Sequence, residues 1–248
     1  MSSSVGELDG QIALITGGAG HIGASIGRAL LDGGATLVIV DREGARLAKV
    51  ARQLDAERVH TYEVDVTDET AIHTLVDRIW QMHGGLDIAV AGAGVMDTWP
   101  LEELTTERFM SSIEINLASA LAMCRAVSHP MREAGYGRIV TMSSNAALVR
   151  STVSGLAYAV AKSGLFQLTR LLATELGPNG ITVNCIAPSA IETRMSRSFG
   201  DDTLARAAQA SPTGRIGQPD DVAAAVRFLV SPSAGYVSGI VLPVTGGA

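Results

Sequence analysis

The sequence has little of what disulfide-rich and metal-binding proteins require. Its 248 residues include two cysteines, Cys124 and Cys185, which lie far apart and form no Cys-x-x-Cys pair. Such spacing argues against a disulfide framework and against a cysteine-based metal site. Both thiols are therefore expected to be reduced and buried, and no metal site is predicted.

Long apolar runs and basic clusters are also missing. No run of about 18 uninterrupted apolar residues exists, so no membrane-spanning helix is expected. The first residues show neither the basic nor the apolar part of a signal peptide, which favours a cytoplasmic location. Lys and Arg number 19 against 25 Asp and Glu, and the net charge of -6 argues against binding to nucleic acid or an anionic membrane.

What is present suits one compact enzyme domain over residues 1–248, because 47% of the residues are hydrophobic and 18% are charged. Short apolar runs alternate with helical patterns along the chain, which predicts a parallel sheet covered on both faces. The predicted fold is a Rossmann-type, doubly wound α/β domain. The expected strands are 11–15, 36–40, 58–64, 86–91, 138–142, 182–186 and 240–244. Two helices are expected within 105–133, and 191–218 forms a looser segment.

A glycine-rich turn, Thr16 to Gly23, joins the first predicted strand to a helix. Glycines let the backbone approach a pyrophosphate, and the free N–H groups of a helix N-terminus favour an anion. Asp41 ends the second strand about 20 residues later, where a carboxylate accepts ribose hydroxyls and repels a 2'-phosphate. Asp41 alternatively caps the next helix. No Gly-Lys-Ser/Thr follows the turn, which argues against a nucleoside triphosphatase.

Tyr158 and Lys162 lie four residues apart in a predicted helix, so both side chains can reach one pocket. A phenol has a pKa near ~10, and a cation beside it lowers that pKa. The two residues are a candidate proton-transfer pair. Taken alone, the same spacing also fits an ordinary surface pair.

Together these motifs resemble a classical short-chain dehydrogenase/reductase, from the first strand to the C-terminus. The resemblance implies a dinucleotide cofactor, oxidation of a secondary alcohol or reduction of the matching ketone, and a homotetramer. Two departures stand out: His21 replaces the middle glycine of the turn, and Ala91-Gly92-Ala93-Gly94 replaces Asn-Asn-Ala-Gly.

The resemblance also implies roles for particular residues. The catalytic set is Asn116, Ser144, Tyr158 and Lys162. Ser143 is a fallback for Ser144, because relatives often have one residue fewer before the tyrosine. The implied cofactor contacts are Gly17, Gly20, His21, Ile22, Gly23, Asp41, Arg42, Asp65, Val66, Ala91, Gly92, Ala93, Tyr158, Lys162, Pro188, Ile191 and Thr193.

NAD is the expected cofactor because of Asp41, although Arg42 beside it leaves NADP open. The expected substrate is a small alcohol or ketone, hydrophobic or cyclic, bound beneath a substrate loop at about 191–218. An acidic substrate paired with Arg150 is a weaker possibility. The candidate pocket residues are Val95, Met96, Asn145, Ala146, Leu156, Ala190 and Phe199.

Several alternatives stay open at this point. One is an NADP(H)-dependent carbonyl reductase of the 3-oxoacyl type. Another is a dinucleotide-binding protein that has lost its chemistry, although such a protein has no need to keep Ser144, Tyr158 and Lys162. A methyltransferase shares the glycine turn and the acidic second strand but has no use for these three residues either.

Overall fold

The computed structural model describes residues 6–54, 57–149 and 153–248. In this part of the chain seven parallel strands form one sheet, in the order β3-β2-β1-β4-β5-β6-β7. The strands are β1 (Ile12–Thr16), β2 (Thr36–Asp41), β3 (Val59–Glu63), β4 (Ile88–Ala91), β5 (Gly137–Met142), β6 (Ile181–Pro188) and β7 (Val241–Val244). The predicted parallel α/β fold is confirmed.

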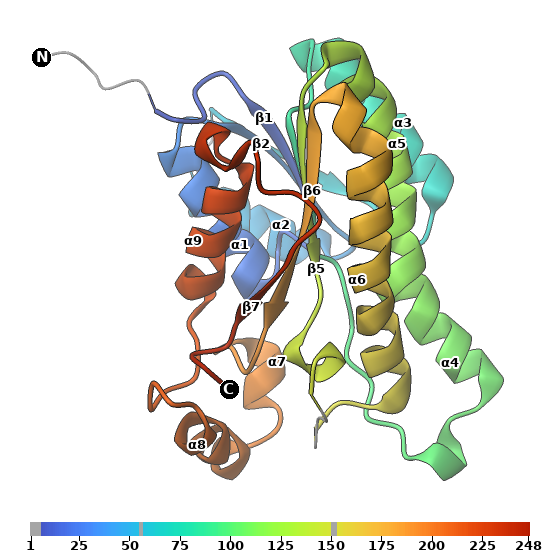
Figure 1. Ribbon diagram of the computed structural model, residues 1–248, viewed down its shortest axis with the longest axis vertical. Coiled ribbons are helices and arrows are strands. Elements are labelled where there is room, and N and C mark those ends of the chain that lie inside the picture. Colours follow the sequence, from blue (N-terminus) through green and yellow to red (C-terminus); the bar gives the residue numbers. More distant parts are fainter. Residues whose placement is uncertain (1–5, 55–56, 150–152) are drawn as a thin grey trace, which may run out of the picture.

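Helices cover both faces of the sheet, which Figure 1 shows nearly edge-on. The helices are α1 (His21–Asp32), α2 (Gly44–Ala51), α3 (Glu69–His83), α4 (Thr106–Ile113), α5 (Ser119–Ala134), α6 (Leu156–Leu176), α7 (Arg194–Arg197), α8 (Asp201–Ala210) and α9 (Pro219–Val230). Helices α1, α2 and α9 lie on one face and α3, α5 and α6 on the other. No helix in the described ranges is long and apolar enough to span a bilayer.

The strands feed a separate hydrophobic core on each face. Along β1, Ile15 packs toward α1 and α9, whereas Leu14 packs toward α3 and α5, because neighbouring side chains of a strand point to opposite faces. Cys124 and Cys185 are both buried and free, as predicted. Burial raises the pKa of the Cys124 thiol to about 12, so this thiol is unreactive at neutral pH.

The order of the strands reverses between β1 and β4, which is where open α/β sheets bind their ligands. Gly17, directly after β1, adopts a left-handed φ of 68°. A Cβ on Gly17 would lie 2.8 Å from the backbone of Ala93, directly after β4. The two turns therefore meet backbone to backbone, and position 17 requires glycine.

Two segments differ from the sequence prediction. The helices predicted within 105–133 are joined by a π-helical turn, Glu114–Ala118. The looser segment at 191–218 contains α7 and α8. Helix α7 begins with a capping box between Thr193 and Ser196, and Gly200 allows the chain to turn into α8 with a φ of 83°.

Candidate active site

A cavity of about 950 Å³ opens at the carboxyl ends of the strands, beneath α7 and α8. Its walls come from β1 and the first turns of α1, from the turns after β4 and β5, from α6 and from the segment after β6. Many of the residues predicted for the site lie together on its lining. These are Ile22, Gly23, Gly92, Met96, Ser144, Asn145, Ala146, Tyr158, Lys162, Pro188, Ala190, Ile191, Thr193 and Phe199.

Tyr158 lies in the first turn of α6 and shares a side-chain hydrogen bond with Ser144. Burial raises the pKa of Tyr158 above its ordinary value. The hydrogen bond from Ser144 opposes that rise, whereas the charge of Asp97 adds to it. The direction differs from the lowered pKa expected from the sequence, because desolvation of the phenolate outweighs the other influences on Tyr158.

Lys162 lies one turn further along α6, with its Nζ 5.7 Å from the centre of the Tyr158 ring. The ammonium group is buried and donates a hydrogen bond of 2.8 Å to the Met142 carbonyl. Burial lowers the pKa of Lys162 to about 8. The two predicted proton-transfer groups thus lie close together, while burial makes each of them harder to charge.

Ser144, rather than the fallback Ser143, carries the hydroxyl that belongs to this group. Ser143 is buried and donates a hydrogen bond of 2.7 Å to the Lys162 carbonyl. This bond joins the end of β5 to α6, so the Ser143 proton is not available to a substrate. Ser144 caps the short 3-10 turn Asn145–Ala147 and bonds to Tyr158. Only the geometry separates two adjacent serines that both fit the spacing.

Asn116 lies in the π-helical turn and is buried. Its Nδ2 donates to the Val95 carbonyl at 2.9 Å, and its Oδ1 accepts from the Val95 N–H at 3.1 Å. A Cβ on Gly94 would lie 2.8 Å from Asn116 Oδ1 and 3.0 Å from Lys162 Nζ. Gly94 thus leaves room for the asparagine and lysine side chains to approach each other.

The glycine turn fits a pyrophosphate. Helix α1 begins after Gly20 with no side-chain cap and no acidic residue in its first turn, so its first N–H groups are open to an anion. A Cβ on Gly23 would collide with the Gly17 carbonyl, which explains that glycine. His21 is the first helical residue, a position that needs no glycine, and its Nδ1 accepts from the Arg194 N–H at 3.4 Å.

Asp41 holds the glycine turn rather than capping α2. One oxygen accepts from the Ala19 N–H and the other from the Glu43 N–H, each at 3.2 Å. Glu43 itself is the residue before the first turn of α2. The helix-cap alternative for Asp41 is therefore wrong, and its carboxylate lies beside the turn at the end of β2.

The remaining residues predicted for the adenosine end gather near Asp41, outside the lining of the cavity. Asp65 and Val66 follow β3, the neighbour of β2. Hydrogen bonds from Thr67 lower the pKa of Asp65, and the nearby charge of Arg42 lowers it further. Arg42 is exposed, and its positive charge already interacts with the Asp65 carboxylate.

Thr16 contacts the turn in which Ala91 and Gly92 stand in place of the two asparagines of the family pattern. Its Oγ1 accepts from the N–H groups of Gly92 and Ala93, at 3.2 and 3.4 Å, and donates to the Val90 carbonyl at 3.5 Å. This hydroxyl joins the end of β1 to the turn after β4, with Ala91 buried between them.

Two residues predicted for the substrate pocket do not line this cavity. Val95 is occupied by its backbone bonds to Asn116 and lines a second cavity. Leu156 is the first residue of α6 and is 48% exposed. Position relative to a motif could not reveal these orientations. Arg150, the weaker candidate for an acidic substrate, lies outside the described residues.

The segment after β6 supplies wall residues that the motifs did not single out. They are Met195, Ser196, Thr203, Leu204, Arg206, Ala207 and Ala210, together with Val149 and Val153 before α6. The apolar members recur on one face of α8, at Leu204 and Ala207, a helical spacing that could have revealed them.

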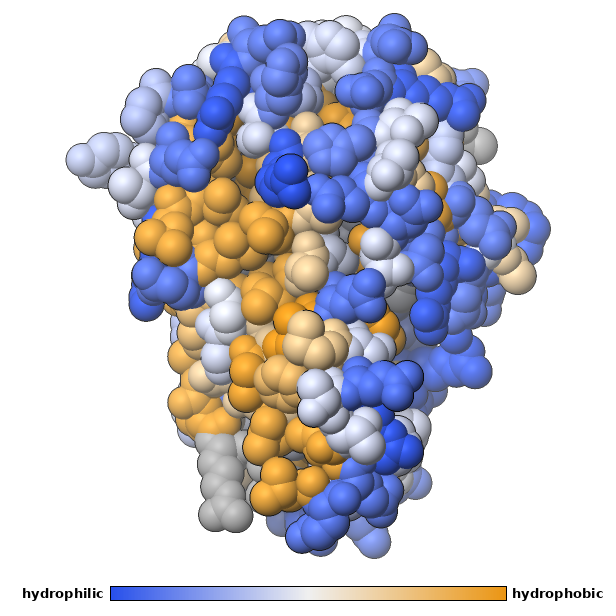
Figure 2. Space-filling view, turned by 90° about the vertical axis from the view of Figure 1, so that its right-hand side faces the viewer, coloured by the Kyte–Doolittle hydropathy of each residue, from blue (hydrophilic) through white to orange (hydrophobic). Residues whose placement is uncertain are grey.

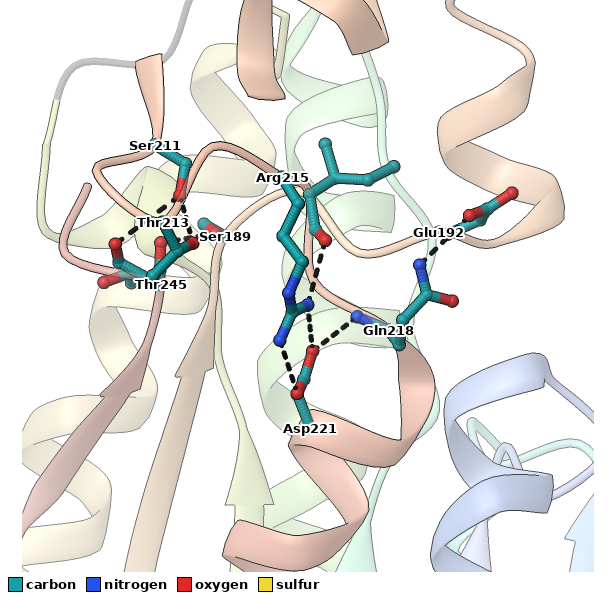
Figure 3. Close-up of polar contacts among 10 residues, drawn as sticks. Ser189, Glu192, Ser211, Thr213, Arg215, Gln218, Asp221 and Thr245 are labelled. Atoms are coloured by element: carbon teal, nitrogen blue, oxygen red, sulfur yellow. Dashed lines mark hydrogen bonds and ion pairs between the residues drawn. The ribbon is translucent and has the colours of Figure 1, made fainter. Parts of the chain in front are cut away.

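A polar network fastens the base of the substrate loop, as Figure 3 shows. Arg215 binds Asp221 through two hydrogen bonds of 2.6 and 3.0 Å, and Asp221 also accepts from the Gln218 N–H. The Gln218 side chain reaches Glu192 on the opposite strand of the loop at 3.1 Å. Both ends of the loop are thus tied to the start of α9.

Comparisons with known proteins show that the chain is similar to dehydrogenases and reductases. A family model described as enoyl-(acyl carrier protein) reductase matches residues 17–248. D-threitol dehydrogenase of Mycolicibacterium smegmatis is 37% identical over 97% of this chain and 94% of its own. Cis-4-hydroxycyclohexanecarboxylate dehydrogenase of Sinomonas cyclohexanicum is 38% identical over 96% of each chain. The 3-oxoacyl-[acyl-carrier-protein] reductase of Escherichia coli is 35% identical over 97% of this chain and 98% of its own.

A solved structure has the same fold. The crystal structure of gox2181 superposes with a TM-score of 0.92 and 34% identity, covering 97% of this chain and 96% of that chain.

Proposed function

We propose, from the premise that the chain belongs to the classical short-chain dehydrogenase/reductase family, that it transfers hydride between NAD(H) and a secondary alcohol or the matching ketone. One observation carries the proposal. Ser144, Tyr158 and Lys162 line a single cavity that extends to Ile22 and Gly23 in the first turn of α1. A dinucleotide bound at the turn would bring its nicotinamide to these three side chains.

Each group has a distinct task in this proposal. A bound nicotinamide supplies the hydride acceptor or donor. The Tyr158 hydroxyl exchanges a proton with the substrate oxygen, and Ser144 donates a hydrogen bond to that oxygen. Lys162 anchors the nicotinamide ribose and favours the phenolate of Tyr158, and Asn116 supports the path by which protons reach solvent.

The charges at the adenosine end support NAD over NADP. Asp41 and Glu63 are neighbours across β2 and β3, and Asp65 follows two residues later. A 2'-phosphate in this region would meet several carboxylates, and Arg42 is already near Asp65. Ribose hydroxyls, in contrast, can donate to carboxylates.

The cavity favours an apolar or cyclic substrate. Met96, Met195 and Phe199 supply apolar wall to the cavity that Tyr158 lines, and its described lining has only two charged side chains, Lys162 and Arg206. The relative that acts on cis-4-hydroxycyclohexanecarboxylate supports a ring-shaped alcohol. The 3-oxoacyl-[acyl-carrier-protein] reductases among the relatives favour the alternative, an NADP(H)-dependent reductase of a 3-oxoacyl substrate.

The protein is further proposed to act in the cytoplasm as a homotetramer. The substrate loop over 191–218 is proposed to close over the bound substrate, because α7 and α8 form one wall of the cavity.

A panel of secondary alcohols and ketones tests the proposal, with the absorbance of the reduced nicotinamide as the readout. NAD and NADP are compared at subsaturating concentration, in both directions. We expect turnover of cyclic or apolar members with a clear preference for NAD. Equal efficiency with the two cofactors would remove the argument from Asp41, and a preference for 3-oxoacyl thioesters with NADPH would establish the alternative.

A further inference from the structure

Asp97, in the loop after β4, bonds to two other elements near the active site, α4 and the start of α6. Its Oδ2 accepts a hydrogen bond of 2.7 Å from Ser112 on α4. Its backbone carbonyl accepts one of 2.6 Å from the N–H of Gly155, the residue before the first turn of α6. Asp97 therefore connects the loop after β4 both to α4 and to the start of the helix that carries Tyr158.

The contact with Ser112 leads on to Asn116. A serine hydroxyl has one proton, and Ser112 gives it to Asp97, so its lone pairs remain free to accept. The Ser112 Oγ then accepts from Asn116 Nδ2 at 3.3 Å, and the Ser112 carbonyl accepts from the same nitrogen at 3.0 Å. The chain of donors runs in one direction, from Asn116 through Ser112 to the carboxylate.

The contacts with Ser112 and with Val95 favour the same orientation of the Asn116 amide. With its nitrogen turned to Ser112 and to the Val95 carbonyl, its oxygen accepts from the Val95 N–H and lies against Gly94, as does Lys162 Nζ. An amide turned the other way would set its oxygen against the carbonyls of Val95 and Ser112. Its nitrogen would then face the Val95 N–H and, across Gly94, the ammonium group of Lys162.

We propose that Asp97 is a positioning residue: its carboxylate orients the Ser112 hydroxyl, which holds the Asn116 amide with its oxygen on the side of Lys162. The inference rests on the proposed function, because it concerns how Tyr158, Lys162 and Asn116 are arranged for proton transfer. Nothing in the family pattern recognised in the sequence requires an acidic residue at position 97.

A second consequence comes from the charge of Asp97. Its Oδ1 is buried and has no hydrogen-bond partner in the described part of the chain, and it lies against Gly155. This negative charge raises the pKa of Tyr158. Lys162 faces the tyrosine from α6, while Glu103, Glu107 and Arg108 line the second cavity together with Asp97.

Four variants separate orientation from charge. Asp97→Asn keeps an oxygen that can accept from Ser112 but removes the charge. Ser112→Ala removes the link and keeps the charge, and Asp97→Ala removes both. Glu107→Gln is the matched control, because it removes a carboxylate from the same cavity outside the chain of hydrogen bonds among the described residues.

Turnover of the alcohol is measured against pH at saturating cofactor. Ser112→Ala and Asp97→Ala should each lower kcat by roughly tenfold, because the Asn116 amide loses its fixed orientation, and Asp97→Asn should restore most of that loss. Asp97→Asn and Asp97→Ala should move the rising limb of the profile to lower pH. Glu107→Gln should change neither quantity.

The ionisation of Tyr158 is also followed without any substrate. The ultraviolet absorbance of tyrosinate is compared between each protein and the same protein carrying Tyr158→Phe, over the alkaline range in which circular dichroism shows the fold intact. We expect ionisation at lower pH in Asp97→Asn. Fluorescence of bound NADH and thermal unfolding report whether each variant is folded.

The outcomes test the role of Asp97 separately from the proposed function. Wild-type kcat in folded Ser112→Ala or Asp97→Ala would overturn the positioning role. An unchanged tyrosinate titration in Asp97→Asn would remove the effect of the charge. Turnover that survives Tyr158→Phe would instead overturn the proposed function, whereas the titration would still report on Asp97.

Discussion

Lys162 places an amine inside the protein, where burial lowers its pKa to about 8. Its hydrogen bond to the Met142 carbonyl compensates for part of the lost hydration. The protonated form is disfavoured in the fold and not in the unfolded chain, so Lys162 reduces stability below the folded pKa. The reduction fades as pH rises toward the unfolded value of about 10.5.

Replacing Lys162 with Met should therefore abolish turnover and stabilise the fold. At neutral pH the gain in unfolding free energy should reach about 3 kcal/mol, and it should shrink as the pH rises above 8. Urea unfolding measures the gain at each pH. The exposed Lys49, the only other lysine in the sequence, supplies the control Lys49→Met, for which no such gain is expected. A less stable Lys162→Met protein at neutral pH would contradict the burial argument.

Among the elements that line the site, helices α7 and α8 contain no buried residue. They are carried between the end of β6 and the start of α9, and the network of Arg215, Asp221 and Gln218 fastens their base. A bidentate arginine–carboxylate pair defines geometry better than a single contact does. The network is therefore expected to act on substrate binding more than on cofactor binding.

Arg215→Gln should raise the KM for the alcohol by several-fold and weaken the affinity for NAD by less. Steady-state kinetics and cofactor fluorescence provide the two readouts. Arg227→Gln breaks a comparable exposed pair, Arg227 with Glu7 at 2.7 Å, in the last turn of α9 rather than at its start, and should leave KM unchanged. Equal effects of the two substitutions would show that the position of the pair at the loop base does not matter.

Most of the helices and strands could be predicted from the sequence. Strand and helix positions followed from apolar periodicity, because buried parallel strands need apolar runs and the helices between them need one apolar face. The glycine turn, Asp41 and the pair on α6 could be found because backbone geometry dictates each of them. Periodicity could not reveal the π-helical turn around Asn116, since its pattern differs from an α-helix by a single residue.

Other features of the site depend on long-range contacts. The choice between Ser143 and Ser144 rests on which hydroxyl meets the Lys162 carbonyl. The direction of the Tyr158 pKa depends on burial, which the spacing of two residues does not encode. Asp97 and Ser112 are 15 residues apart, and only the folded chain brings them to Asn116.

At the scale of the whole molecule, apolar side chains remain exposed on the side formed by α4, α5 and α6. Helix α6 alone exposes Leu156, Val160 and Leu171. Figure 2, which looks onto this side of the molecule, shows apolar side chains gathered in a continuous area. Large exposed apolar areas commonly mark contacts between proteins, which supports the proposed homotetramer.

Val160→Glu should break the assembly, because a charge in an apolar interface loses its hydration. Light scattering should give about four times the chain mass of 25.7 kDa for the unmodified protein and a smaller species for the variant. Met82→Glu on α3, another exposed apolar position, is the control and should keep the larger mass. A monomer mass for the unmodified protein would end the tetramer proposal.

Tyr158 is proposed to exchange the substrate proton at the cofactor site. Tyr158→Phe removes one oxygen atom from the cavity and leaves the glycine turn and Asp41 in place. Turnover of the best alcohol from the panel is measured beside the fluorescence of bound NADH. We expect kcat to fall by at least roughly a hundredfold, the usual contribution of a positioned acid or base, while the affinity for NADH stays unchanged. Turnover near that of the unmodified protein, with NADH still bound, would contradict it.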